Sequence, residues 1–221
     1  MADKIQNMTD KEKKRRMALR IVYYIIGTVV MAFGVALSIR AEIGVAPGTV
    51  IAAAAAELTP LTIGQSTACF NVFCVLVQIA ITRRPTLNHA FQFPMAYVFG
   101  FILDIFYDML ELALPNIFYS LLYLVIGIII FSIGIRILVG ANILMTPPDA
   151  LAKSMGASFG WPMSKAKLIF DIAVTVIAAL LTFILVGNPL LVVGIGTLLC
   201  ALATGPLIGL FTKLFPFFDV G

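Results

Sequence analysis

The stretch Ile143–Lys153, I-L-M-T-P-P-D-A-L-A-K, interrupts a long apolar run with two prolines, a carboxylate and a lysine. A related stretch, Ile43–Thr49 (I-G-V-A-P-G-T), lies one hundred positions earlier. Proline removes a main-chain donor, so it breaks a helix or begins one. Two proline-broken segments at matching positions predict a binding site between two halves of a membrane protein.

The composition places the chain in a lipid bilayer. Hydrophobic residues make up 61% of the 221 residues, charged residues 12%, and the mean hydropathy is +1.06. A soluble domain carries about a quarter charged residues. The apolar stretches are long and continuous, without the alternation of a barrel strand. The sequence therefore predicts an all-α membrane protein.

Six apolar runs are long enough to cross a bilayer, which takes about 20 helical residues. The predicted spans are Leu19–Ile39, Leu61–Thr82, Phe91–Leu112, Phe118–Val139, Met163–Val186 and Leu190–Leu214, the last broken at Gly205-Pro206. The two proline-led segments, Gly44–Glu57 and 147–155, are too short to cross. We expect short broken helices there, either re-entrant or interfacial.

Charge is concentrated at the N-terminus. Residues 1–20 hold seven basic and three acidic side chains, and seven minus three gives +4, the net charge of the whole chain. We interpret residues 1–17 as a basic cytoplasmic segment of a bacterial inner-membrane protein, because basic residues stay on the cytoplasmic side. With six spans, the C-terminus is then also cytoplasmic. Nothing else in the chain indicates a nucleic-acid partner.

The chain also reads as an internal repeat, residues 18–115 followed by residues 116–221. A shift of one hundred positions brings like residues together: Gly27 with Gly127, Gly34 with Gly134, Ala41 with Ala141, Pro47 with Pro147 and Phe70 with Phe170. Each copy holds three spans, so the second copy must cross in the opposite direction. The prediction is two inverted three-helix repeats, each with a short broken helix, a plan common in secondary transporters.

Several motifs resemble the YczE/YyaS/YitT family of bacterial multipass inner-membrane proteins. They are Gly44–Pro47, L-T-I-G-Q at Leu61–Gln65, R-R-P at Arg83–Pro85 and the Gly100–Asp104 spacing. Relatives often follow the first proline with W-D-V-L, where this chain has Gly48-Thr49-Val50-Ile51 and so lacks a carboxylate. The resemblance implies a multipass bacterial inner-membrane protein and supplies no substrate.

Polar residues inside the predicted spans are the candidates for function, because ionisable groups in a membrane face a bundle interior or a water-filled cavity. Asp171 and its counterpart Asn71 would meet across a pseudo-two-fold axis, although a helix–helix hydrogen bond explains them as well. Asp104 and Asp171 are the candidates for proton coupling. The residues predicted to contact a solute are Pro47, Gly48, Thr49, Gln65, Asn71, Thr146 and Asp171.

Arg136, Asp149 and Lys153 are predicted to form structural ion pairs. Arg136 needs a carboxylate, and Asp149 and Asp171 have suitable depths. Asp149 also suits the first turn of its helix, where a carboxylate interacts favourably with the helix dipole. Lys153 lies one turn further on and can pair with Asp149.

The predicted function is secondary transport of a small polar or anionic organic solute by alternating access, with proton coupling as an option. The alternative is a membrane scaffold or regulator that binds a partner protein, which would have a sealed interior with every carboxylate paired. No nucleophile–base pair or phosphate loop indicates an enzyme. The only histidine, His89, is expected in a polar connection, and the cysteines are scattered, so these residues provide no metal site. We expect no cofactor. Glycine-lined spans also allow a homodimer.

Overall fold

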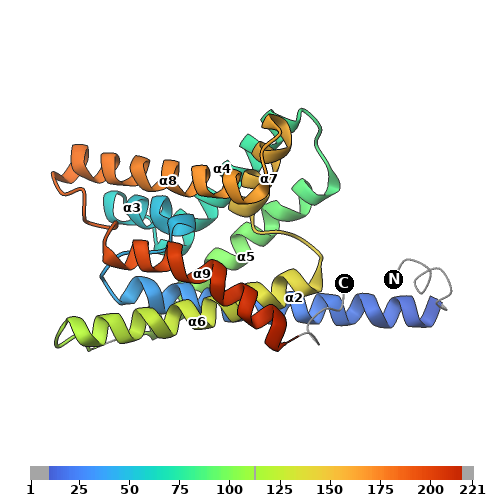
Figure 1. Ribbon diagram of the computed structural model, residues 1–221, viewed down its shortest axis with the longest axis horizontal. Coiled ribbons are helices and arrows are strands. Elements are labelled where there is room, and N and C mark those ends of the chain that lie inside the picture. The colour runs from blue at the N-terminus through green and yellow to red at the C-terminus, as the bar shows by residue number, and fades with distance from the viewer. Residues whose placement is uncertain (1–9, 112, 216–221) are drawn as a thin grey trace.

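The computed structural model describes residues 10–111 and 113–215, and every regular element there is helical. The elements run in the order α2 (Asp10–Arg40), the 3-10 turn η1 (Pro47–Thr49), α3 (Val50–Leu58), α4 (Ile63–Thr82), α5 (Leu87–Met109), α6 (Ile117–Ala141), α7 (Pro147–Phe159), α8 (Met163–Val186) and α9 (Ile195–Leu214). Figure 1 shows the long helices running roughly lengthwise, with α2 and α6 along one side and α8 along the other.

Six of these helices, among the described residues, are long and apolar enough to cross a membrane. They are the six predicted spans, so the all-α membrane class is confirmed. α2 begins earlier than predicted, because residues 10–17 of the basic segment continue its helix. Residues 1–9, the predicted end of the third span at Leu112 and the C-terminal residues 216–221 lie outside the described residues.

Two local expectations were wrong. His89, expected in a polar connection, lies buried in the first turn of α5, where its Nδ1 accepts a hydrogen bond from the main-chain nitrogen of Thr86 at 3.1 Å. The predicted break at Gly205-Pro206 is absent, and α9 continues through Pro206. Transmembrane helices tolerate an internal proline where local adjustments satisfy the freed carbonyl.

α2 and α6 form the antiparallel centre of the bundle, and glycines let their main chains approach closely. A Cβ atom at Gly27 would lie 3.1 Å from the carbonyl oxygen of Gly134. One at Gly127 would lie 3.0 Å from the carbonyl oxygen of Gly34. The two contacts are reciprocal. A shift of one hundred positions turns Gly27 into Gly127 and Gly34 into Gly134, so each contact is the repeat counterpart of the other.

Most other helix contacts also occur in pairs. α5 packs on α2 as α9 packs on α6, α3 contacts α4 as α7 contacts α8, and α7 contacts α4 as α3 contacts α8. One contact lacks its counterpart. α4 packs along α5, whereas α8 and α9 barely touch within the part of the chain that the structure describes.

The α4–α5 contact is closed by two glycines and a carboxylate. A Cβ atom at Gly64 would collide with the carbonyl oxygen of Gly100, so neither position has room for a larger residue. Beyond them, Asp104 of α5 caps the N-terminus of α4. Its Oδ1 accepts from the main-chain nitrogen of Gly64 and its Oδ2 from the hydroxyl of Thr62, each at 2.6 Å.

Candidate functional site

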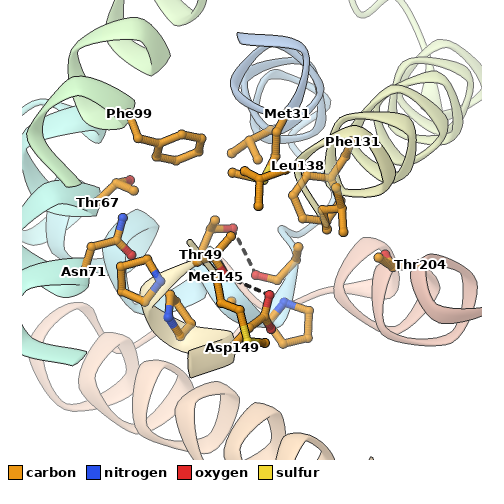
Figure 2. Close-up of a pocket in the computed structure, with 18 of the residues that line it drawn as sticks. Met31, Thr49, Thr67, Asn71, Phe99, Phe131, Leu138, Met145, Asp149 and Thr204 are labelled. Atoms are coloured by element: carbon orange, nitrogen blue, oxygen red, sulfur yellow. Dashed lines mark hydrogen bonds between the residues drawn. The ribbon is translucent and has the colours of Figure 1, made fainter. Parts of the chain in front are cut away.

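A cavity of about 300 Å³ lies between the two halves of the chain. The α2–α6 pair forms one wall, α4 and α5 a second, and α8 and α9 contribute the remainder (Figure 2). η1 and α7 both begin at this cavity, because Pro47 and Pro147 start them there. Both short helices are packed inside the bundle, with the buried residues Ala52, Ala53, Leu151 and Ala152.

Three charged side chains line the cavity and contact one another. The Lys167 ammonium lies 2.7 Å from an Asp171 carboxylate oxygen and 3.1 Å from an Asp149 carboxylate oxygen. The second oxygen of Asp149 accepts from the Thr146 hydroxyl at 2.7 Å. Each of the three charged side chains is between 21% and 33% exposed. They face the cavity without being sealed from it.

Asn71 is the polar residue on the opposite wall. It is only 6% exposed, and its amide makes no hydrogen bond to any residue that the structure describes. Figure 2 shows the amide pointing into the cavity. The amide is therefore available to a molecule bound in the cavity.

Neighbouring Gln92 also lines the cavity. Its side-chain oxygen accepts a hydrogen bond from the side-chain nitrogen of Gln78. The same nitrogen of Gln78 donates to the carbonyl oxygen of Pro147 at 3.1 Å. This connection fixes the start of α7 against α4.

Many lining residues are related by a shift of one hundred positions. The related pairs are Met31 and Phe131, Val35 and Ile135, Ala46 and Thr146, Pro47 and Pro147, Gly48 and Pro148, Thr49 and Asp149, Thr67 and Lys167, and Asn71 and Asp171. The cavity is thus built from corresponding positions of the two halves. All of its fixed charges come from the second half.

Six of the seven residues predicted to contact a solute line this cavity, namely Pro47, Gly48, Thr49, Asn71, Thr146 and Asp171. Gln65 does not. It is exposed, and its side-chain oxygen accepts from the main-chain nitrogen of Thr62 at 3.1 Å as part of a capping box. The spacing Thr-x-x-Gln is itself a capping-box signature, so the sequence already held the local explanation.

The predicted ion pairs differ from those in the structure. Asp149 pairs with Lys167 and not with Lys153, which is exposed. Arg136 pairs with neither Asp149 nor Asp171. Its guanidinium is buried and donates to the main-chain carbonyl of Phe215 at 3.1 Å. The arginine thus ties Phe215, the residue that follows α9, to α6.

Comparison with known proteins identifies a family and two bacterial relatives. Residues 18–213 match DUF6198, described as a family of unknown function. The chain belongs to this family. It is similar to two proteins of Bacillus subtilis (strain 168). The uncharacterized membrane protein YczE is 24% identical over 87% of this chain and 85% of its own length. The uncharacterized protein YyaS is 22% identical over 89% and 94%. No solved structure matches.

Two of the motifs behind the resemblance to the YczE-like proteins, Leu61–Gln65 and Gly100–Asp104, serve packing in this family member. Thr62 and Gly64 receive the Asp104 carboxylate, and Gly64 meets Gly100 at the α4–α5 crossing. Asp104 is not among the residues that line the cavity. These two motifs together therefore describe one closed helix contact.

The most important residue missing from the predicted site is Lys167. It lies in the second turn of α8 and was not among the candidate residues. A signal was present, since Lys167 and Asp171 are four residues apart on one helix face. Its second partner, Asp149, lies on a different helix, and no sequence spacing indicates that contact. Thr28, Thr67, Gln92 and Thr204 were missed as well.

Proposed function

We propose that this membrane protein is a secondary transporter for a small polar organic solute, which binds in the cavity between the two halves. One observation carries the proposal: corresponding positions of both halves line one cavity, which is mostly apolar and has a cluster of charged side chains on one side. Transporters built from repeats bind solute at the interface between the repeats, beside interrupted helices. A scaffold protein would have no use for such a cavity, and we propose no enzymatic activity.

We infer that the halves are inverted repeats. The reciprocal contacts of Gly27 with Gly134 and of Gly34 with Gly127 support this architecture. The paired helix contacts around α2 and α6 support it too. In this arrangement η1–α3 and α7 are re-entrant helices, entering from opposite sides.

We infer further that the end of the bundle at which α2 begins is cytoplasmic. The basic residues Lys11, Lys13, Lys14, Arg15 and Arg16 lie in the first turns of α2. The connection between α4 and α5 adds Arg83 and Arg84 at the same end. The positive-inside rule places such an end in the cytoplasm. The protein would then be a bacterial inner-membrane protein with both termini inside.

The asymmetry of the helix contacts supports an inward-open state. α4 and α5 close the outer end through Gly64, Gly100 and Asp104. The corresponding contact between α8 and α9, at the inner end, is missing. In our proposal the cavity exchanges solute with the cytoplasm between α8 and α9. Closing that gap while α4 and α5 separate would expose the cavity to the outside.

Proton coupling is assigned to Asp171 in preference to Asp104. Both oxygens of Asp104 are engaged as a cap on α4, away from the cavity. Asp171 is bonded through one oxygen to Lys167 and lies beside the solute space. A carboxylate that contacts solute and solvent in turn can exchange a proton in each cycle.

The test is solute-dependent proton flux in proteoliposomes that contain a trapped pH indicator. We expect flux in the wild-type protein, loss of flux in Asp171→Asn, and normal flux in Asp108→Asn, whose carboxylate is exposed on α5. Unchanged flux in Asp171→Asn would remove this residue from the mechanism. Absence of flux for cationic, anionic and neutral solutes alike would reject transport.

A further inference from the structure

The cavity carries a formal negative charge. Asp149 and Asp171 contribute two negative charges and Lys167 one positive charge, which leaves −1. The other titratable lining groups are the Tyr24 phenol and the Cys200 thiol, both neutral in their ordinary forms. An unbalanced charge inside a membrane protein is costly. One monovalent cation, or one proton, would balance it.

The hydroxyl groups of the cavity are arranged to accept hydrogen bonds. Five threonines line it, and each donates its hydroxyl hydrogen elsewhere: Thr28, Thr49, Thr67 and Thr204 to main-chain carbonyls and Thr146 to Asp149. They present only lone pairs to a solute. Oδ2 of Asp171 also has no partner among the described residues, because Lys167 binds Oδ1. These walls suit a solute rich in hydrogen-bond donors.

Asn71 adds an independent sign of a ligand. The residue is only 6% exposed, and its amide has no hydrogen-bond partner within the described part of the chain. It projects into the same cavity as Asp171 (Figure 2). Its oxygen can accept from a bound ammonium or guanidinium group. A solute in the cavity would supply the partner that this amide lacks among the described residues.

The apolar wall also suits a cation. The aromatic rings of Tyr24, Phe99 and Phe131 line the cavity together with Met31. An aromatic face attracts an organic cation through its quadrupole and excludes water at the same time. An anion would find no such contact here.

We propose that the transported solute is a monovalent organic cation bearing an ammonium or guanidinium group, and that it is exchanged for one proton. This inference rests on the proposed transport function and specifies its substrate. It replaces the broader expectation of a polar or anionic solute. A monovalent anion would make the formal charge of the cavity more negative, from −1 to −2.

The exchange balances in charge and in protons. Without solute, Asp171 carries a proton, and Asp149 and Lys167 cancel, so the cavity is neutral. A monovalent cation entering from either side displaces that proton, which leaves on the same side. The ionised Asp171 then balances the cation, and the cavity is again neutral. Each cycle moves one cation in one direction and one proton in the other, with no net charge crossing the membrane.

Three compounds of similar shape test the charge requirement: methylguanidinium, neutral methylurea and anionic methanesulfonate. Each is loaded separately into proteoliposomes that contain a pH indicator. We expect an outward gradient of methylguanidinium to acidify the lumen about tenfold faster than an equal gradient of methylurea. One charge-assisted hydrogen bond supplies a discrimination of this size. The rate should not respond to a potassium–valinomycin potential. Asp171→Asn should fall to the rate of empty liposomes, while Asp108→Asn should match the wild type.

The outcomes separate this inference from the proposed function. Proton flux driven by methanesulfonate or methylurea, but not by methylguanidinium, would reject the proposal that the solute is a cation and would still support transport. Flux with methylguanidinium that changes sign with the membrane potential overturns the one-for-one exchange. No flux with any of the three compounds counts against both proposals. Replacing methylguanidinium by tetramethylammonium, which has no hydrogen to donate, should lower the rate, and an equal rate would overturn the role given to the acceptors.

Discussion

The two halves of this protein repeat the same local plan and differ in one helix contact. In the first half, α4 and α5 are held together by Gly64, Gly100 and the Asp104 cap. In the second half, α8 and α9 are apart, and the positions one hundred later hold Ser164, Cys200 and Thr204. The first half has a close glycine crossing and a carboxylate, Asp104, that links α5 to α4; we call this link the latch. The second half has neither feature. In the proposed cycle these are the outer and the inner gate.

The halves also differ in charge where they face each other. The first half offers Thr49, Thr67 and Asn71 to the cavity, and the corresponding positions of the second half are Asp149, Lys167 and Asp171. A symmetric cavity would carry twice the charge or none. Neutral polar groups on one side and an ionic cluster on the other let the solute bring the balancing charge.

The largest effect is expected at the closed contact. Gly64→Ala should lower the free energy of unfolding by about 3 kcal/mol or more, because the new Cβ atom meets the main chain of Gly100. Thermal unfolding in detergent measures this change. Ser164→Ala, at the corresponding position of the open half, is exposed and should leave the unfolding temperature unchanged. Equal losses in both variants would mean that α8 and α9 are packed as closely as α4 and α5.

The next effect concerns the charged wall. Lys167→Met removes the partner that Asp149 and Asp171 share, and we expect a loss of about 2 kcal/mol. This is less than the ~3–5 kcal/mol for a fully buried pair, since the cluster is partly exposed. Adding Asp171→Asn to Lys167→Met should restore most of the unfolding temperature. Thr67→Val, the matched change in the neutral half, removes one hydroxyl and should cost about 1 kcal/mol. No recovery in the double variant would show that like-charge repulsion is not the cause.

The sequence predicted the features that depend on nearby residues. Met163–Val186 was predicted with both of its ends correct, because Pro162 and Gly187 stand on either side of a long, mostly apolar run. The starts of η1 and α7 followed from Pro47 and Pro147. Contacts between distant elements could not be predicted this way. Asp104 binds Gly64 from forty residues away, and nothing in its own helix distinguishes a cap from a proton-coupling carboxylate.

The latch at the outer gate gives a smaller effect. Asp104→Asn keeps the shape of the side chain but replaces one acceptor oxygen by a donor, so only one of the bonds from Thr62 and Gly64 survives. We expect a loss of about 1–2 kcal/mol in unfolding free energy. Asp108→Asn, one turn further along α5 and exposed, should show no change.

The same variant also tests the gate. A cysteine replacing Gly48, where a side chain has open space, reports access to the cavity. In a background without Cys69, Cys74 and Cys200, it should react faster with an impermeant thiol reagent from outside when Asp104 is also changed to Asn. An unchanged rate would make Asp104 a structural cap with no part in opening.

The smallest change in stability is expected at Asn71, and it distinguishes a binding residue from a packing residue. Its amide has no partner among the described residues, so Asn71→Ala loses no protein hydrogen bond and removes a buried polar group. The free energy of unfolding should change by less than about 0.5 kcal/mol. Solute-dependent proton flux should nevertheless fall, through a higher KM, because the solute loses an acceptor. Asn71→Asp should instead raise the negative charge of the first half and weaken the one-for-one exchange. A clear drop in the unfolding temperature of Asn71→Ala with flux unchanged would assign the residue to packing, and the two halves would then differ in architecture but not in solute recognition.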